Sequence, residues 1–333
     1  MNKLILILSG LLFFVQGVKA ESCEEKQGAV DFGSGTTKAF VAVVDVCRKE
    51  MLSVVYEERL PLPLNEALEK SDNKELPPSV LEKALPQIQA MIEKMREQRV
   101  QKISGVATSV FRVAKNGSQM ARNLSQKLQI PVQVISQERE AELGFWSALA
   151  QKKQEPQKPL IVWDIGGGSM QMYSQQNGKV HIYQGDMASV TYKNKILEVL
   201  QFKDPKKFSS PNPIGRQREA ALQLAKNHAY LNVPAYFKKE APRARWIGVG
   251  GVLSMSVQRQ VHKGATGFTQ SELDQVLQNR VHLKDADIDS DYRISDISNL
   301  ALVLGYMQAL KIEKVETVQA SLGQGLLFYN LHH

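Results

Sequence analysis

Two stretches of this 333-residue chain share one pattern, an apolar strand that ends in an aspartate and runs into a glycine-rich turn. The first stretch is "AVDFGSGTTKAF", with Asp31 before the turn, and the second is "LIVWDIGGGSMQMY", with Asp164 before the turn. Each turn leads into a second strand-like run, so each stretch predicts a β-hairpin. A chain that restarts with the same plan in its second half is expected to form two similar lobes with a cleft between them.

Strand-like and helical segments alternate around these hairpins. Apolar residues spaced three and four apart predict helices over 77–100, 117–129 and 137–151. Further strands are predicted over 51–62, 102–109 and 132–136. Asn177-Gly178 predicts a tight turn in the second half of the chain. This alternation is typical of an α/β protein.

Residues 1–20 have the composition of a secretory signal peptide. Lys3 supplies a positive charge, "LILILSGLLFFVQG" is a short apolar run, and small residues precede a cleavage site after Ala20. An uncleaved anchor helix is the alternative, and the apolar run is short for spanning a bilayer. No later segment looks transmembrane, so no stable membrane insertion is expected. We predict a secreted protein, with a bacterial periplasm as the expected compartment.

The only two cysteines are Cys23 and Cys47. An oxidising compartment permits a disulfide between them. In a hairpin centred near Gly35, residues whose numbers sum to 70 face each other, and these cysteines satisfy that relation. We predict a disulfide just beyond the strands, with two free buried thiols as the alternative.

The formal net charge is +8, and its excess is local. From Thr191 to Gly250 there are twelve Lys and Arg residues against four Asp and Glu residues. A basic patch of this kind attracts polyanions, but taken alone it is better explained as a solvated helical face. No nucleic-acid motif appears, so no nucleic-acid partner is expected.

The glycine-rich turns suit phosphate binding. Backbone N–H groups in a tight turn hold phosphate without a counter-charge, and glycine lets the backbone approach closely. The aspartate that opens each turn can hold a hydrated Mg²⁺ ion or position water. "VGGVLS" (249–254) offers a third turn of this kind at a helix start.

The order of motifs resembles the exopolyphosphatase/guanosine pentaphosphate phosphatase (Ppx/GppA) family. The motifs are "AVDFGSGTTKAF", "GVATSVFRVAKNG", "VISQEREAELG", "DIGGGSMQ", "GVGGVLS" and "LGQGLL". The resemblance implies an α/β fold of two RNase H-like lobes, as in actin-like and sugar-kinase ATPases, with an interlobe cleft. The expected division is a signal peptide over 1–20, lobe I over 24–131 and lobe II over 132–317. Residues 318–333 are expected to return to lobe I.

The resemblance also implies an activity, the hydrolysis of a terminal phosphoanhydride in polyphosphate or a guanosine penta- or tetraphosphate. Glu140 matches the general base for the attacking water, and Arg112 matches an arginine that clamps phosphate oxygens. Asp31 and Asp164 match aspartates near Mg²⁺ and water, and Asp164 is also a catalytic candidate. The implied phosphate-binding positions are Gly33, Ser34, Thr36, Gly166, Gly167, Gly168 and Ser169.

The chain also departs from the family pattern. Gln171 and Gln324 stand where charged residues are usual, Gly35 replaces an asparagine, and Glu142 replaces an arginine. A carboxamide brings no negative charge, so metal affinity at Gln171 is expected to fall.

These observations favour an exported, Mg²⁺-dependent exopolyphosphatase. Two alternatives stay open, a catalytically degenerate protein that binds polyphosphate or a nucleotide, and a guanosine pentaphosphate phosphohydrolase. An ATP-dependent kinase is disfavoured because a periplasm lacks ATP. The sequence leaves open a homodimer, the identity of the metal and the choice of phosphate substrate.

Overall fold

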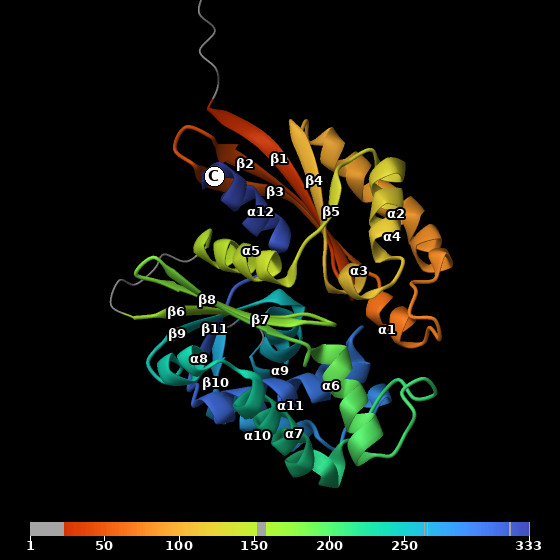
Figure 1. Ribbon diagram of the computed structural model, residues 1–333, viewed down its shortest axis with the longest axis vertical. Coiled ribbons are helices and arrows are strands. Elements are labelled where there is room, and N and C mark those ends of the chain that lie inside the picture. The colour runs from red at the N-terminus through yellow and green to blue at the C-terminus, as the bar shows by residue number, and fades with distance from the viewer. Residues whose placement is uncertain (1–22, 152–157, 263, 265, 320, 333) are drawn as a thin grey trace, which may run out of the picture.

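The structure, a computed structural model, describes residues 23–151, 158–262, 264, 266–319 and 321–332. Two mixed β-sheets, each covered by helices, lie one above the other in Figure 1. The predicted signal peptide falls outside the described residues. Within them, no helix combines the length and the apolar character that crossing a membrane requires.

The first sheet has five strands in the order β3-β2-β1-β4-β5. Its strands are β1 (Glu24–Phe32), β2 (Thr36–Asp45), β3 (Glu50–Pro61), β4 (Lys102–Ala107) and β5 (Val132–Val134). β1, β2 and β3 are antiparallel, whereas β4 runs parallel to both β1 and β5. The helices of this half are α1 (Leu64–Glu69), α2 (Pro78–Glu97), α3 (Ser109–Val113) and α4 (Gly117–Leu128). β5 extends the first sheet to Val134, three residues beyond the boundary expected after residue 131.

The second sheet has six strands in the order β10-β11-β9-β6-β7-β8. Its strands are β6 (Leu160–Ile165), β7 (Met170–Gln176), β8 (Lys179–Gly185), β9 (Arg245–Val249), β10 (Gly267–Thr269) and β11 (Lys314–Thr317). Its helices are α6 (Ser189–Lys195), α7 (Arg218–Asn232), α8 (Ala235–Glu240), α9 (Gln258–Val261), α10 (Gln270–Arg280) and α11 (Arg293–Leu310). Short π-helices occupy Ile196–Leu200 and Val252–Val257, and 3-10 turns occupy Gly215–Gln217 and Asp285–Asp287. β6 and β7 form the predicted hairpin, and β7 and β8 turn at Asn177-Gly178 as predicted.

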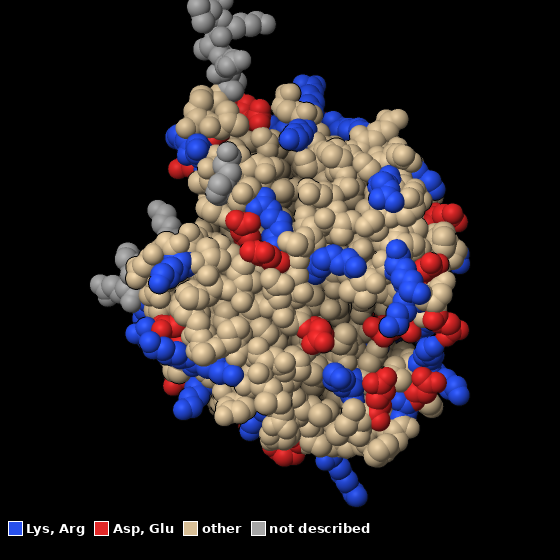
Figure 2. All heavy atoms as spheres, in the orientation of Figure 1, with Lys and Arg blue, Asp and Glu red and all other residues tan. Residues whose placement is uncertain are grey.

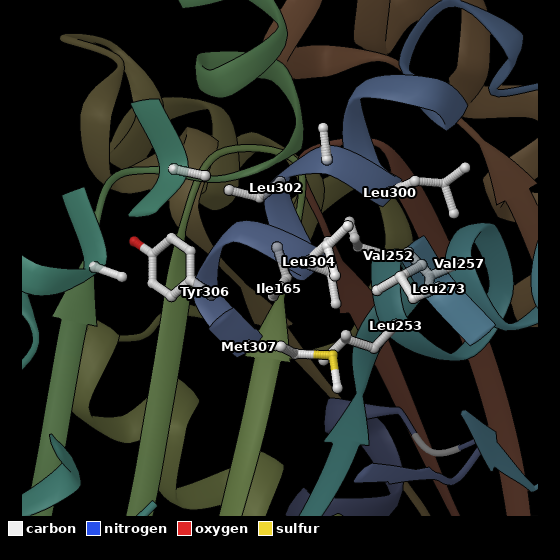
Figure 3. Close-up of a cluster of buried hydrophobic side chains, with 14 of the residues drawn as sticks. Ile165, Val252, Leu253, Val257, Leu273, Leu300, Leu302, Leu304, Tyr306 and Met307 are labelled. Carbon is white, nitrogen blue, oxygen red and sulfur yellow. The ribbon is translucent and has the colours of Figure 1, made fainter. Parts of the chain in front are cut away.

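Each half has its own hydrophobic core. In the second half, α11 is apolar almost all round and packs Leu300, Leu304 and Met307 among residues of β6 and of the π-helix that follows β9 (Figure 3). In the first half, Val30 and Phe32 of β1 pack against α2 and α4. Two cores built on two sheets confirm the predicted two-lobed α/β architecture.

Two helices lie between the sheets, α5 (Gln137–Leu149) and α12 (Leu322–His332) (Figure 1). α5 packs on β6 and β7, whereas α12 packs on β1 and β2 and also along α5. The helices come very close at Gly325, where an added Cβ would lie 1.9 Å from the Leu143 carbonyl oxygen. The last helix of the chain therefore covers the sheet that the first strands build.

The first hairpin forms as predicted but with a register one residue different. Paired residues of β1 and β2 sum to 69, as in Glu24 opposite Asp45, because the turn is centred between Ser34 and Gly35. Cys23 and Cys47 still form the predicted disulfide, with a Cα–Cα distance of 5.4 Å. The disulfide lies at the end of the hairpin remote from the glycine turn.

Candidate active site

Asp31 and Asp164 occupy equivalent places in the two sheets. On the side of the first sheet that faces α12, Ala29 packs in the apolar cluster of that helix, and Asp31 continues the same face two residues later. On the side of the second sheet that faces α5, Val162 packs in the α5 cluster and Asp164 continues that face. The side chains of both aspartates therefore enter the space between the lobes. Asp31 and Asp164 are 4% and 8% exposed.

The cross-strand partners of the aspartates are also equivalent. Asp31 faces Lys38 on β2, and Asp164 faces Gln171 on β7, so each partner lies seven residues after its aspartate. The two lobes thus share a backbone plan but place different groups beside the carboxylate. The first lobe places a cation there and the second a neutral amide.

A cavity of about 290 Å³ lies between the lobes and collects most of the predicted site. The predicted residues that line it are Asp31, Gly33, Ser34, Thr36, Glu140, Asp164, Gly166, Gly167 and Ser169. Gly168 and Arg112 are not in the lining. The opposite wall comes from the second lobe, where the Tyr292 hydroxyl lies 2.7 Å from the Thr36 Oγ1 atom.

Glu140 reaches the cavity from the first turn of α5. Ser136 caps this helix by accepting a hydrogen bond from the Arg139 N–H, which fixes where the first turn begins. Glu140 is 5% exposed, and its Oε2 atom lies 2.6 Å from the Nη2 atom of Arg112. Arg112 also donates from Nη1 to the Ile135 carbonyl oxygen at 3.1 Å. Arg112 therefore contacts the carboxylate and the strand end before α5, and it lies behind Glu140 outside the cavity lining.

The glycine loops of the two lobes approach each other closely. A Cβ on Gly167 would lie 3.3 Å from the Ser34 Cβ, and one on Gly168 would lie 2.9 Å from Asn65 Oδ1. Gly168 therefore lies against side chains of α1 and α3 in the first lobe. Gly250 has φ +80°, and a Cβ there would lie 2.1 Å from the Asp164 Oδ1 atom. Only glycine leaves room for the Asp164 carboxylate at this position.

Burial dominates the electrostatics of the three carboxyl groups. Desolvation raises the pKa of Glu140 to about 7, against the opposing effect of Arg112. Desolvation also raises the pKa of Asp164 to about 6, and Lys38 opposes this shift. The pKa of Asp31 is raised by burial and lowered in part by Lys38, whose Nζ lies 3.8 Å from Asp31 Oδ2. A positive charge in this cavity would stabilise the ionised form of all three buried carboxyl groups.

The donor set fits a divalent cation that is bound partly by water. The Asp31 Oδ1 atom is buried and accepts no hydrogen bond from the protein, and the Asp164 carboxylate enters the same cavity. Mg²⁺ commonly takes one or two carboxylates and completes its shell with water and phosphate oxygens. Among the described residues, the one group of three Asp, Glu, His or Cys ligands within 4.8 Å contains the disulfide cysteines and lies elsewhere. The site thus suits a divalent cation that keeps several waters.

Gln171 and Gln324 are both buried, and neither lines the cavity. Gln171 donates from Nε2 to Ser169 Oγ at 2.9 Å, and its Oε1 atom has no hydrogen-bond partner. Gln324 accepts at Oε1 from Gln151 Nε2 at 3.1 Å and from its own turn. The Gln171 amide thus binds the Ser169 hydroxyl of the second glycine loop, and the Gln324 amide binds the backbone at the start of α12.

Sequence reasoning missed several residues that line the cavity. Lys38 and Arg59 lie within strands, Arg59 directly after Glu57 and Glu58, and Asn65 lies in the first turn of the short helix α1. Lys38 lies opposite Asp31 only in the observed register, because the predicted register would place Ala39 there. The place of Arg59 depends on how β3 pairs with β2. Two register shifts between these strands make that pairing unpredictable from the sequence.

The basic residues between Lys193 and Arg245 lie in mixed environments, and several of them are paired with carboxylates. Lys193 is fully buried, and its Nζ donates to Glu66 Oε1 at 2.7 Å across the lobes. Arg218, Arg243 and Arg245 are ion-paired with carboxylates. This stretch, described throughout, contributes no lysine or arginine to the cavity lining. On the face shown in Figure 2, basic and acidic side chains are interspersed over both lobes.

A scan against family models matches residues 42–333 to the Ppx/GppA phosphatase family. This chain belongs to the Ppx/GppA phosphatase family. The match begins within β2, so Asp31 and the first glycine loop precede it, and their likeness to Asp164 and its loop rests on the geometry described above.

Solved structures of Ppx/GppA proteins share the fold over nearly their whole length. A family member from Aquifex aeolicus is 15% identical with a TM-score of 0.70, covering 93% of this chain and 98% of that chain. An exopolyphosphatase from Cytophaga hutchinsonii is 16% identical with a TM-score of 0.72, covering 92% and 98%. A nucleoside triphosphate hydrolase from Neospora caninum is more distant, 10% identical with a TM-score of 0.55, covering 93% and 92%. At these low sequence identities, the structural similarity shows that the proteins share the two-lobed fold and shows nothing more.

Proposed function

We propose that this protein is an exported exopolyphosphatase, which hydrolyses the terminal phosphoanhydride bond of inorganic polyphosphate with Mg²⁺. The observation that carries the proposal is the meeting of three buried carboxyl groups and two glycine loops in one interlobe cavity. Membership of the Ppx/GppA phosphatase family supports the reaction class. The Cys23–Cys47 disulfide supports export, because disulfides persist in oxidising compartments.

Glu140 is the proposed general base. It accepts a proton from a water molecule, whose oxygen forms a new bond to the terminal phosphorus. The bond from that phosphorus to the bridging oxygen breaks, orthophosphate is formed, and the bridging oxygen leaves with the shortened chain. A base with a pKa of about 7 is well matched to neutral pH. Arg112 holds the Glu140 carboxylate toward the cavity and is proposed as a positioning residue.

The remaining parts of the site hold the substrate. Backbone N–H groups of the loops at Gly33–Gly35 and Gly166–Gly168 are proposed to bind the terminal phosphate, helped by Ser34, Thr36 and Ser169. Asp31 and Asp164 would hold a bound Mg²⁺ ion, which would neutralise charge on the phosphate oxygens. Lys38, beside both carboxylates, balances their charge and contacts the same phosphate region.

A second candidate is a non-catalytic protein that binds polyphosphate or a nucleotide in this cavity. The neutral Gln171 beside Asp164 favours it, because an amide adds no charge for a metal. Guanosine pentaphosphate hydrolysis is the third candidate, and export disfavours it because guanosine alarmones are cytosolic.

The first test is phosphate release from long-chain polyphosphate by the mature protein, with Mg²⁺ and with a chelator. We expect Mg²⁺-dependent release that Glu140→Gln lowers about 100-fold or more, since general-base catalysis contributes that much. Glu142→Gln is the matched control, because this carboxylate lies on the same helix and pairs with Arg139. Polyphosphate binding without release would favour the second candidate, and release from guanosine pentaphosphate alone would favour the third.

A further inference from the structure

Three charged side chains form one row across the first sheet. Asp31 on β1 faces Lys38 on β2, and Lys38 faces Arg59 on β3. Cross-strand partners project to the same face of a sheet, and all three residues line the interlobe cavity. Strands lie about 4.8 Å apart, so the row extends about 10 Å from Asp31 toward the edge strand β3.

The positive charge of the cavity is confined to this row. Among the described residues that line the cavity, Lys38 and Arg59 supply all the lysine and arginine side chains. Besides Asp31, Glu140 and Asp164, the acidic residues that line the cavity are Glu66 and Asp291, and both lie outside this row. A ligand with several negative charges is therefore attracted along the sheet and away from the other walls.

Arg59 forms a weak ion pair with Glu57. Its Nη2 and Nε atoms lie 2.7 and 3.0 Å from the Glu57 Oε1 atom on the same strand. The two side chains are 25% and 36% exposed, and ion pairs this open contribute little free energy. An inner phosphate of a polyphosphate chain carries one negative charge, as a carboxylate does, but its oxygens match the planar guanidinium and the neighbouring phosphates add further attraction. It can therefore displace Glu57.

We propose that Lys38 and Arg59 form a phosphate track for the inner phosphates of a linear polyphosphate chain, with Glu57 as the occupant that the chain displaces. The proposal rests on the proposed function, because it takes the terminal phosphate to lie at Asp31 and Asp164. A long chain reaches Arg59, whereas pyrophosphate ends near Lys38. Arg59 therefore determines the preference for long chains.

The test measures binding in the Glu140→Gln background, so that turnover does not consume the ligand. Dissociation constants are measured by calorimetry for long-chain polyphosphate and for pyrophosphate. We expect Arg59→Gln to weaken long-chain binding about tenfold, the worth of one charge-assisted hydrogen bond, and to leave pyrophosphate binding unchanged. Glu57→Gln should tighten long-chain binding. Arg59→Lys should give an intermediate dissociation constant, because lysine keeps the positive charge but lacks the planar pair of donors of the guanidinium.

Arg48→Gln is the matched control. Arg48 is a more exposed arginine at the far end of the same hairpin, where it pairs with Asp45, and its loss should change neither constant. Denaturation midpoints confirm that each variant is folded. Equal weakening of both ligands by Arg59→Gln, or no weakening, would overturn the track and leave the proposed function standing. Failure of the Glu140→Gln protein to bind any linear phosphate would overturn both.

Discussion

Glu140 carries its carboxyl group where a charge is disfavoured, and this makes the stability of the protein depend on pH. Burial raises its pKa from 4.5 in the unfolded chain to about 7 in the folded protein. The folded state therefore binds the proton more tightly, and the stability this provides is complete below pH 4.5. It is lost as the pH rises from about 4.5 to about 7.

We expect Glu140→Gln to abolish this loss. With chelator present, the variant should gain up to about 3 kcal/mol in free energy of unfolding over the wild type at pH 8, and the gain should disappear near pH 4. Urea denaturation at several pH values measures the difference. A gain that does not change with pH would mean that the pKa of Glu140 is the same in the folded and unfolded states.

At the scale of single residues, the strand–aspartate–glycine pattern indicated Asp31, Asp164 and the glycine loops, whereas the family resemblance indicated Glu140. All three carboxylates line the cavity. Lys38 and Arg59 escaped notice because their role comes from cross-strand pairing, and a charged residue in a strand has no local signature. The burial of Lys193 was likewise invisible, since its partner Glu66 lies 127 positions away.

At the scale of elements, the contact of α5 with α12 controls where Glu140 lies. Gly325→Ala would place a methyl group against the backbone of Leu143, so α5 would have to move. We expect a loss of about 1–3 kcal/mol in unfolding free energy, typical of overpacking, together with reduced phosphatase activity. Asn330→Ala on the exposed side of α12 is the control and should change neither. Unaltered activity in a destabilised Gly325→Ala protein would show that α5 tolerates the shift.

The long elements were predictable, and some of the short ones were not. The hairpins and α2 have clear periodicity over many residues, and the structure confirms them. α1 has six residues and no side-chain cap, and β10 has three residues, so neither carries enough pattern to be recognised. The first hairpin was placed one residue out of register because its turn has two possible centres, and only the pairing of β1 with β2 distinguishes them.

At the scale of the whole molecule, ion pairs join the lobes. Lys193 is buried and pairs with Glu66 of α1, whereas Lys206 pairs with Asp72 at the surface. Removing one partner of a buried pair leaves the other without compensation, so Lys193→Met should lower the unfolding free energy by about 3 kcal/mol. Lys206→Met should leave the denaturation midpoint nearly unchanged, because surface pairs contribute little.

Hydrogen exchange would show how these lobes are joined. In Lys193→Met, we expect faster exchange in α1 and α6, the two helices that this pair links, and unchanged exchange in α2 and α4. Similar exchange in Lys193→Met and Lys206→Met would mean that the buried pair does not hold the lobes together.

The return of α12 to the first sheet has a consequence for how the chain folds. Ala29 and Phe40 lie against Leu327 and Leu331, which follow the whole second lobe in the sequence. The inner face of the first sheet therefore stays uncovered until α12 docks on it. Contacts between segments this far apart in sequence slow folding, so we expect the covered face of the first lobe to form late.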